Sequence, residues 1–251
     1  MSGHNKWSTI KHKKAANDKA RGKAFTKIIR ELTISARLGG SSPEANPRLR
    51  TAILKAKDIN MPKDTIERAI KKGAGELEGS NFEEFLYEGY GPGGVAILME
   101  IMTDNKNRTA SDVRSTMTKA GGNLGASGCV AYMFDKKGLL VFDANIISEE
   151  KAMEIGIDVG AEDISGDDKN IEVTTKVEDF ENVLKAFDDA KVPHISAEIT
   201  MIPNTYHDVS EDKIEKILNL IEKLEDLDDI QNVYTNLNIP DNFNFLSINN
   251  K

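Results

Sequence analysis

The chain has 251 residues, of which 39% are hydrophobic and 29% charged, so it can form one large domain or two to three small ones with modest cores. Its formal net charge of −8 by itself argues against a polyanionic partner such as nucleic acid. The single cysteine, Cys129, excludes a disulfide framework and a cysteine-based zinc site within one chain. No apolar run approaches the roughly 18 residues of a membrane span, and no apolar stretch follows the basic N-terminus as in a signal peptide. We therefore expect a soluble protein of the reducing cytoplasm.

The charge is distributed very unevenly along the chain. Residues 1–72 contain 18 lysines and arginines and 6 acidic residues, a net charge of +12. Residues 73–251 contain 15 and 35, a net charge of −20. Such asymmetry indicates a basic module joined to acidic ones, and it points to nucleic acid or an anionic surface.

The first 20 residues form a basic arm. Beyond Met1 they contain only two large apolar side chains, Trp7 and Ile10, and they carry five lysines against Asp18. Such a segment cannot bury enough apolar surface to fold alone, and we expect it to order on a partner.

Three helices are predicted after the arm. Apolar residues recur with helical spacing from Phe25 to Ala36, with cations on the opposite face, and Gly39-Gly40 ends this helix. A second helix begins at Asn46-Pro47, a cap followed by proline at the first helical position. A third begins at Met61-Pro62 and ends at Gly73. The expected product is a small basic bundle whose outward cations are Arg48, Arg50, Lys55, Lys57, Arg68, Lys71 and Lys72.

A different pattern follows the Gly-rich linker at 73–80. Strands are predicted at 95–102, 130–134, 139–143, 171–175, 195–202 and 231–237, with a further short one at 162–165. Helices are predicted at 111–120, 148–156, 178–190 and 214–224. This alternation favours an α+β fold with mainly antiparallel sheets.

The elements also suggest how the domains are arranged. Residues 139–202 supply a complete ferredoxin-like β-α-β-β-α-β set, whereas the flanking pieces are incomplete separately and complete each other. We predict three domains: a basic helical domain with its arm at 1–78, a discontinuous α+β domain at 79–135 and 205–245, and an inserted ferredoxin-like domain at 136–204. Two sequential domains are the alternative.

The glycine-rich motifs do not match known phosphate loops. The run from Gly89 to Gly94 precedes a strand and contains no lysine. The glycines from Gly121 to Gly128 follow a helix and precede a strand, the reverse of the dinucleotide-binding order. We interpret both runs as turns and helix ends.

The densest polar cluster is the loop 103–109. It offers groups that can contact an anion or a base edge, and we treat it as a secondary contact site made of Asp104, Asn105, Lys106, Asn107 and Arg108. The structural alternative is a strand-to-helix loop in which a Thr or Asp side chain caps the next helix. No His or Cys lies nearby to support nucleophilic catalysis.

No metal or catalytic constellation emerges from the other residues. The four histidines are His4, His12, His194 and His207, and none forms the i, i+3 or i, i+4 pairs that place two imidazoles on one metal. Cys129 is expected to be a small buried residue. Acidic pairs such as Asp228-Asp229 are most simply solvated loops or helix ends. We predict neither a cofactor nor a metal, and no enzyme activity.

The basic arm carries the main functional hypothesis. Each Lys or Arg that neutralises a phosphate releases counterions, so several such contacts give strong, salt-dependent binding. The ring of Trp7 can stack on an unpaired base, an interaction worth about 1–3 kcal/mol; alternatively it folds back onto the bundle. The predicted nucleic-acid-binding residues are Lys6, Trp7, Lys11, His12, Lys13, Lys14, Arg21, Lys23, Lys27 and Arg30.

Three long segments resemble the YebC/PmpR family, which includes the mitochondrial translational activator of cytochrome oxidase. They read MSGHNKWSTIKHKKAANDKARGKAFTKIIRELTISAR, NPRLRTAILKAKDINMPKDTIERAIKKGAG and EGYGPGGVAILMEIMTDNKNRTASDVRSTMTKAGGNLGASG. The resemblance extends from end to end, and it implies a helical bundle and two α+β domains, the last inserted into the middle one. The chain differs from the common pattern at Lys106, where arginine is usual, and at Cys129, where serine is usual. A lysine lacks bidentate geometry, which weakens a base-reading role for position 106.

The family also implies a function. Members are described as probable transcriptional regulators that bind DNA, while others act in translation at or near the ribosome and relieve stalls on proline-rich stretches. No agreed catalytic residues exist to carry over. We therefore expect a non-enzymatic regulator that binds DNA, with a factor bound to ribosomal RNA as the alternative. An enzyme or small-molecule sensor at the 103–109 loop is a third hypothesis. The acidic α+β domains are the expected contacts to the transcription machinery or the ribosome.

Overall fold

The computed structural model describes residues 18–79, 81–240 and 243, with side chains from residue 22 onward. Its first part is a bundle of three helices, α2 (Asp18–Gly39), α3 (Pro47–Asp58) and α4 (Lys63–Gly73). The core of this bundle contains the apolar positions with helical spacing, among them Leu32, Leu49 and Ile66. The predicted helical bundle is thereby confirmed, although α2 begins earlier than its apolar spacing indicated.

Asn46 ties the bundle together at the turn between α2 and α3. Its side-chain oxygen accepts a hydrogen bond from the amide of Leu49, while its Nδ2 donates to the carbonyls of Ser35 and Gly40, both at 2.8 Å. The cap predicted from Asn46-Pro47 is therefore also a tertiary contact. Near the same end of α2, a Cβ on Gly73 would lie 2.2 Å from the carbonyl oxygen of Thr33, so only glycine lets α4 pack this closely on α2.

A four-stranded antiparallel sheet forms the second part, in the order β3-β1-β2-β8. Its strands are β1 (Glu83–Tyr90), β2 (Ala96–Thr103), β3 (Asn123–Leu124) and β8 (Ile230–Thr235). The helices α5 (Lys106–Lys119) and α8 (Glu211–Glu225) supply apolar side chains to the largest core, which also contains alternate residues of β2 such as Ile97 and Met99. Alternation along β2 turns Ala96 and Leu98 to the opposite face, where Val130 and Phe134 cover them.

The third part is a second antiparallel sheet, in the order β5-β6-β4-β7. It consists of β4 (Phe134–Asp143), β5 (Ala161–Gly166), β6 (Asn170–Thr175) and β7 (His194–Pro203), with α6 (Glu149–Gly156) and α7 (Phe180–Asp189) packed on one face. This is the ferredoxin-like β-α-β-β-α-β arrangement. Its chain segment lies between β3 and β8 of the first sheet, as an inserted domain requires.

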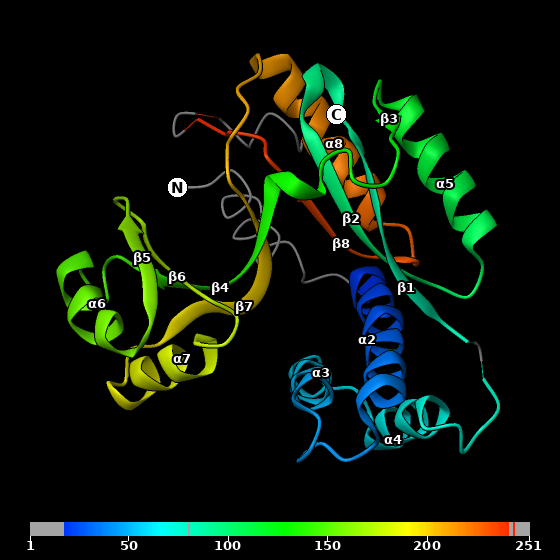
Figure 1. The fold of residues 1–251 in the computed structure, drawn as a ribbon, viewed down its shortest axis with the longest axis horizontal. Coiled ribbons are helices and arrows are strands. Elements are labelled where there is room, and N and C mark those ends of the chain that lie inside the picture. The colour runs from blue at the N-terminus through cyan, green and yellow to red at the C-terminus, as the bar shows by residue number, and fades with distance from the viewer. Residues whose placement is uncertain (1–17, 80, 241–242, 244–251) are drawn as a thin grey trace.

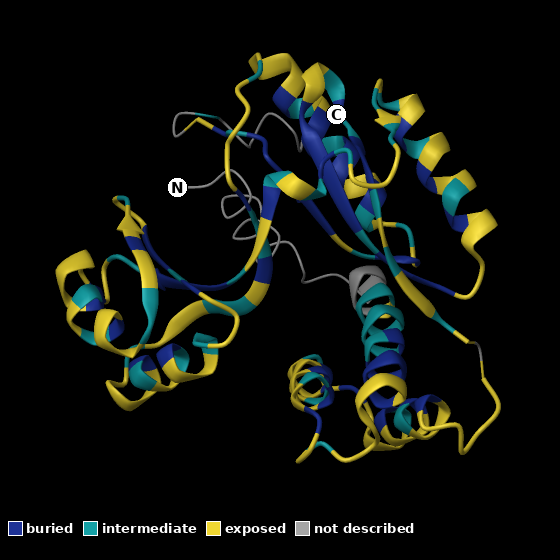
Figure 2. Ribbon diagram, in the orientation of Figure 1, coloured by how far each residue is buried: buried dark blue, intermediate teal, exposed yellow. Residues whose placement is uncertain are grey.

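The α+β class with three domains is thus confirmed (Figure 1). The bundle stands against one end of the first sheet, and β4 and β7 extend from the first-sheet region into the second sheet (Figure 1). Buried residues follow the strands and the inward helix faces of each part (Figure 2). The residue boundaries proposed above, 78/79, 135/136 and 204/205, stay predictions.

Several local predictions were wrong or incomplete. Residues 130–134 do not form a separate strand: a 3-10 helix, Ala131–Met133, precedes a single long β4 that begins at Phe134. The carboxylate of Glu88 binds the amides of Val130 and Ala131, which withdraws them from strand pairing.

The helix predicted at 111–120 begins at Lys106, and its cap is Asn105 rather than a Thr or Asp. Strand β1 was not predicted, and Cys129 is half-buried rather than buried.

Candidate nucleic-acid interface

Three of the predicted phosphate-binding cations lie on α2 at positions 23, 27 and 30. Their i, i+4, i+7 spacing places them on one face of the helix, and that face contacts the first-sheet domain. Lys23 forms an ion pair with Asp226 at 2.6 Å, and the Lys27 ammonium donates to the carbonyl of Gln231 at 3.3 Å. Arg30 reaches the turn between α8 and β8 and the end of β2.

Arg30 is at the centre of this contact. Its guanidinium donates to the carboxylate of Asp229 at 2.7 Å, to the carbonyl of Met102 at 2.9 Å and to the carbonyl of Asp228. The side chains of Arg30 and Asp229 are only 11% and 8% exposed. The ring of Phe82 lies against the guanidinium, with 5.2 Å from Cζ to the ring centroid. Water and phosphate therefore have little access to this arginine.

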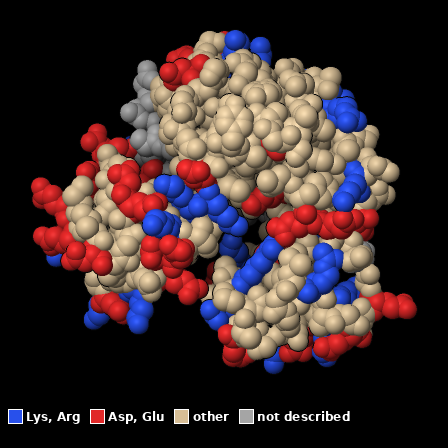
Figure 3. Space-filling model, in the orientation of Figure 1, with Lys and Arg blue, Asp and Glu red and all other residues tan. Residues whose placement is uncertain are grey.

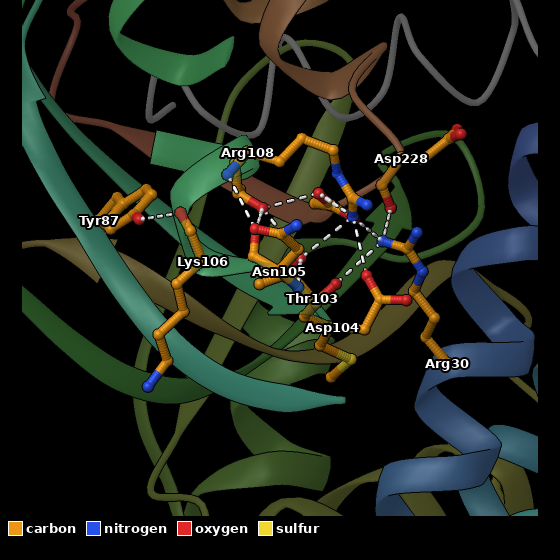
Figure 4. A network of polar contacts seen from close by, with 11 residues as sticks. Arg30, Tyr87, Thr103, Asp104, Asn105, Lys106, Arg108 and Asp228 are labelled. Carbon is orange, nitrogen blue, oxygen red and sulfur yellow. Dashed lines mark hydrogen bonds and ion pairs between the residues drawn. The ribbon is translucent and has the colours of Figure 1, made fainter. Parts of the chain in front are cut away.

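Arg108 of the predicted secondary contact loop binds the same aspartate, and Figure 4 shows Arg108 and Arg30 approaching each other in one network of polar contacts. Asn105 caps α5 by accepting a hydrogen bond from the amide of Arg108 at 3.1 Å. The Arg108 guanidinium donates to Asp104 and Asp229, both at 2.9 Å, and the hydroxyl of Thr109 donates to Asp229 at 2.7 Å. We call Arg30, Arg108, Thr109 and Asp229 the interdomain network.

The pKa of Asp229 reflects this environment. Burial favours the neutral form and would raise the pKa, but hydrogen bonds from Thr109 and Arg108 and the positive charge of Arg30 together hold it below the usual value of an aspartate. Asp229 is therefore ionised at neutral pH. A buried carboxylate that is shared by two arginines is costly to break, because either arginine would be left without its partner.

The remaining residues of the loop lie at the surface. Lys106 forms an exposed ion pair with Glu83 at 2.6 Å and lies over the ring of Phe85. Its backbone carbonyl accepts a hydrogen bond from Tyr87 at 3.4 Å. Asn107 is exposed, in the first turn of α5. The geometry thus assigns most of the loop to helix capping and domain contact, the structural alternative considered above.

The other predicted nucleic-acid-binding residues cannot be placed in this way. Six of them lie outside the described residues, and the backbone of Arg21 belongs to α2, although its side chain also lies outside the description. Their role stays a prediction. The six are Lys6, Trp7, Lys11, His12, Lys13 and Lys14.

The bundle also carries cations that point away from the network. Those on the last turn of α3 and the second half of α4 are exposed: Lys55, Lys57, Arg68, Lys71 and Lys72. By contrast, Arg48 donates hydrogen bonds to Glu31 at 2.7 Å and to Glu84 at 2.9 Å, and the bond to Glu31 is the main reason that the arginine's pKa is raised. The exposed group is open to phosphates, whereas Arg48 is engaged by two carboxylates.

Charge is sorted on the surface as well as along the chain. Figure 3 shows acidic side chains over the outer part of the second-sheet domain, and lysines and arginines where that domain approaches the other two. One exposed pair, Arg50 and Glu181 at 3.9 Å, joins α3 to α7 across this approach.

Sequence reasoning missed two carboxylates that organise the structure. Asp229 was interpreted only as half of a solvated acidic pair, and no role was predicted for Glu88. Glu88 is 4% exposed and binds three backbone amides in the loop that follows β3. Neither position has a signal of its own in the sequence, because an isolated Asp or Glu is most often solvated.

Other kinds of site find little support. Among the residues described, no group of three or more His, Cys, Asp or Glu side chains is placed to hold a metal ion. His207 contacts the carbonyl of Gly93 at 3.0 Å, and His194 lies 3.9 Å from Asp188. No helix within the described ranges is both long and apolar enough to cross a membrane.

Comparison with known proteins decides the family. Residues 5–76 match the profile of the TACO1/YebC protein N-terminal domain, and residues 82–237 match that of the TACO1/YebC second and third domain. The chain belongs to the TACO1/YebC family. The family membership inferred from the three motifs is confirmed.

Individual family members are similar over nearly their whole length. A protein of Treponema denticola named probable transcriptional regulatory protein is 56% identical over 97% of this chain and 98% of its own. One with the same name from Syntrophobacter fumaroxidans is 57% identical over 96% of this chain and 97% of its own. The crystal structure of a conserved hypothetical protein from Aquifex aeolicus superposes with a TM-score of 0.79 at 50% identity, covering 89% of this chain and 93% of that one. The three-domain TACO1/YebC architecture is therefore shared with an experimental structure.

Proposed function

We propose that this TACO1/YebC protein is a non-enzymatic regulator of transcription that acts in the cytoplasm and binds DNA through its basic N-terminal domain. The observation that carries this proposal is the concentration of a +12 charge in residues 1–72, on a bundle held by the interdomain network to domains of net charge −20. The names of its relatives support a role in transcription.

The two charges have complementary effects. The basic arm and the exposed cations of α3 and α4 neutralise phosphates and release counterions. The acidic domains repel the same polyanion, so their acidic outer surfaces disfavour the approach of nucleic acid. Lys23, Lys27 and Arg30 act as positioning residues in this proposal, because they orient the bundle on the first-sheet domain.

Reversing the charge of the arm tests the proposal. Replacing Lys11, Lys13 and Lys14 with glutamate should abolish binding of DNA at physiological salt, because three attractive phosphate contacts become repulsive. Fluorescence anisotropy with a labelled duplex measures the affinity, and circular dichroism verifies that the fold is retained. Replacing the exposed lysines Lys169, Lys176 and Lys185 of the acidic domain with glutamate is the matched control, and it should leave the affinity close to that of wild type. Unchanged binding by the arm variant would remove the arm from the proposal.

The process that is regulated can be identified in cells. Crosslinking the protein and sequencing the attached nucleic acid should recover promoter DNA. Recovery of ribosomal RNA without promoter DNA would contradict a role in transcription and place the protein in translation.

A further inference from the structure

Tyr132 has an unusual position in the 3-10 helix between the first and second sheets. At 69% exposure it is the most exposed large apolar side chain in the described part of the chain. Its neighbours Val130 and Phe134 are buried in the core between the two sheets. An aromatic ring of this size in solvent forgoes the stabilisation that burial would provide.

The backbone on both sides of Tyr132 is firmly held. The carboxylate of Glu88 accepts hydrogen bonds from the amides of Gly128, Val130 and Ala131 at 2.6–2.7 Å. Because these three bonds compensate for burial, the pKa of Glu88 lies below its usual value. The carboxylate therefore stays charged and keeps the segment in place.

Further hydrogen bonds complete this support. The hydroxyl of Tyr90 donates to the carbonyl of Cys129 at 3.0 Å, and the amide of Asn204 donates to the carbonyl of Met133 at 2.8 Å. Gly128 adopts a left-handed conformation, φ +84°, that other residues rarely adopt. Hydrogen bonds with Glu88, Tyr90 and Asn204 thus hold the backbone on both sides of Tyr132, while its ring stays outside the core.

A fixed aromatic ring is suited to binding a planar partner. A tyrosine has two side-chain torsions, so little conformational entropy is lost when its ring is covered. Lys136 and Lys137 follow on β4, and Lys136 is exposed. Figure 3 shows lysine and arginine side chains gathered where the second-sheet domain meets the others. An exposed ring and an exposed lysine four positions later in the chain are side chains of the kinds that bind single-stranded nucleic acid, which has bases for stacking and phosphates for charge.

We propose that Tyr132 is a stacking platform for an unpaired base, and that the protein therefore binds nucleic acid with a single-stranded segment such as a loop, bulge or open strand. This inference rests on the proposed nucleic-acid binding and narrows its substrate class. In a continuous duplex every base is already stacked and paired, so none can cover the ring without being extruded.

The test compares Tyr132→Ala with wild type on an unstructured 12-nucleotide RNA and on a 12-base-pair DNA duplex. For the single strand the affinity should fall about 5- to 150-fold, the usual range for losing one stacked base. The slope of log affinity against log salt should not change, because no phosphate contact is removed. Tyr132→Phe should bind like wild type, since the ring is retained. Affinity for the duplex should be the same in both variants.

The matched control is Ile146→Ala, which removes another exposed apolar side chain, 55% exposed, from the acidic domain. It should leave binding unchanged. Single-strand affinity of Tyr132→Ala equal to wild type would overturn the inference, and so would an equal loss in the Ile146 variant. These outcomes leave the proposed function standing as long as the wild-type protein binds nucleic acid and the arm variant does not. If the wild-type protein binds neither probe at physiological salt, the proposed function itself fails.

Discussion

Replacing Asp229 with alanine should lower the free energy of unfolding by about 3–5 kcal/mol, the usual cost of removing one partner from a buried ion pair. The substitution leaves the guanidinium of Arg30 buried without its carboxylate, and it removes acceptors from Arg108 and Thr109. Urea denaturation followed by circular dichroism measures the change. Because the network joins two domains, the unfolding transition should also become less cooperative.

The control for this variant is Asp226→Ala, three residues away. Asp226 is 62% exposed in its ion pair with Lys23, and such surface pairs contribute about 0–1 kcal/mol. A loss in Asp229→Ala no larger than in Asp226→Ala would contradict the importance of the network.

The effect of Asp229→Ala should also depend on pH. The folded-state pKa of Asp229 lies below that of the unfolded chain, so its contribution is full above the unfolded value of about 3.9 and is lost as the pH falls through the folded value. The difference between wild type and variant should therefore be constant near neutrality and shrink in strong acid. A difference that grows as the pH falls would mean that the aspartate is not stabilised in its charged form.

Replacing Glu88 with alanine should also cost about 3–5 kcal/mol. Three backbone amides in the loop would lose their only acceptor, and each buried unsatisfied donor costs about 1–3 kcal/mol. Hydrogen exchange monitored by NMR should show faster exchange at Gly128, Val130 and Ala131, while the amides of the bundle keep their protection. The segment that carries Tyr132 should become mobile as a result.

Glu84→Ala is the matched control on the same strand. Glu84 forms an exposed ion pair with Arg48, so its removal should cost less than about 1 kcal/mol and leave exchange in the loop unchanged. Exchange at Val130 and Ala131 that is equally slow in wild type and Glu88→Ala would show that other contacts hold this loop.

The interdomain network changes the interpretation of α2. A helix with cations at 23, 27 and 30 has the composition of a phosphate-binding face. In the structure this face contacts Asp226, the Gln231 carbonyl and Asp229, so intramolecular acceptors occupy the positions that phosphates were predicted to take. The acidic C-terminal part of the chain thereby orients the basic module.

Much of the fold was accessible from local patterns. Asn46-Pro47 and Gly73 marked helix ends because capping and close packing place strict demands on single residues. The alternation of strands and helices between 139 and 202 was enough for the ferredoxin-like domain. The strand prediction for residues 130–134 was wrong. VAYMF has the composition of a strand, but the amides of Val130 and Ala131 are bound by Glu88, 42 or more positions earlier in the chain. Strand β1 contains three glutamates and a glycine, residues depleted in strands, and pairing with β2 stabilises it.

The sequence by itself determined the charge division, the helical bundle, the α+β class and the family, since each depends on composition, periodicity or long matching motifs. Only the tertiary structure decided which cations face solvent, which carboxylates are buried and where an aromatic ring stays exposed. Those properties arise from contacts between residues up to 204 positions apart, such as Lys27 and Gln231. A lysine or aspartate has the same identity whether it binds phosphate, water or another domain, and only its neighbours in space distinguish these roles.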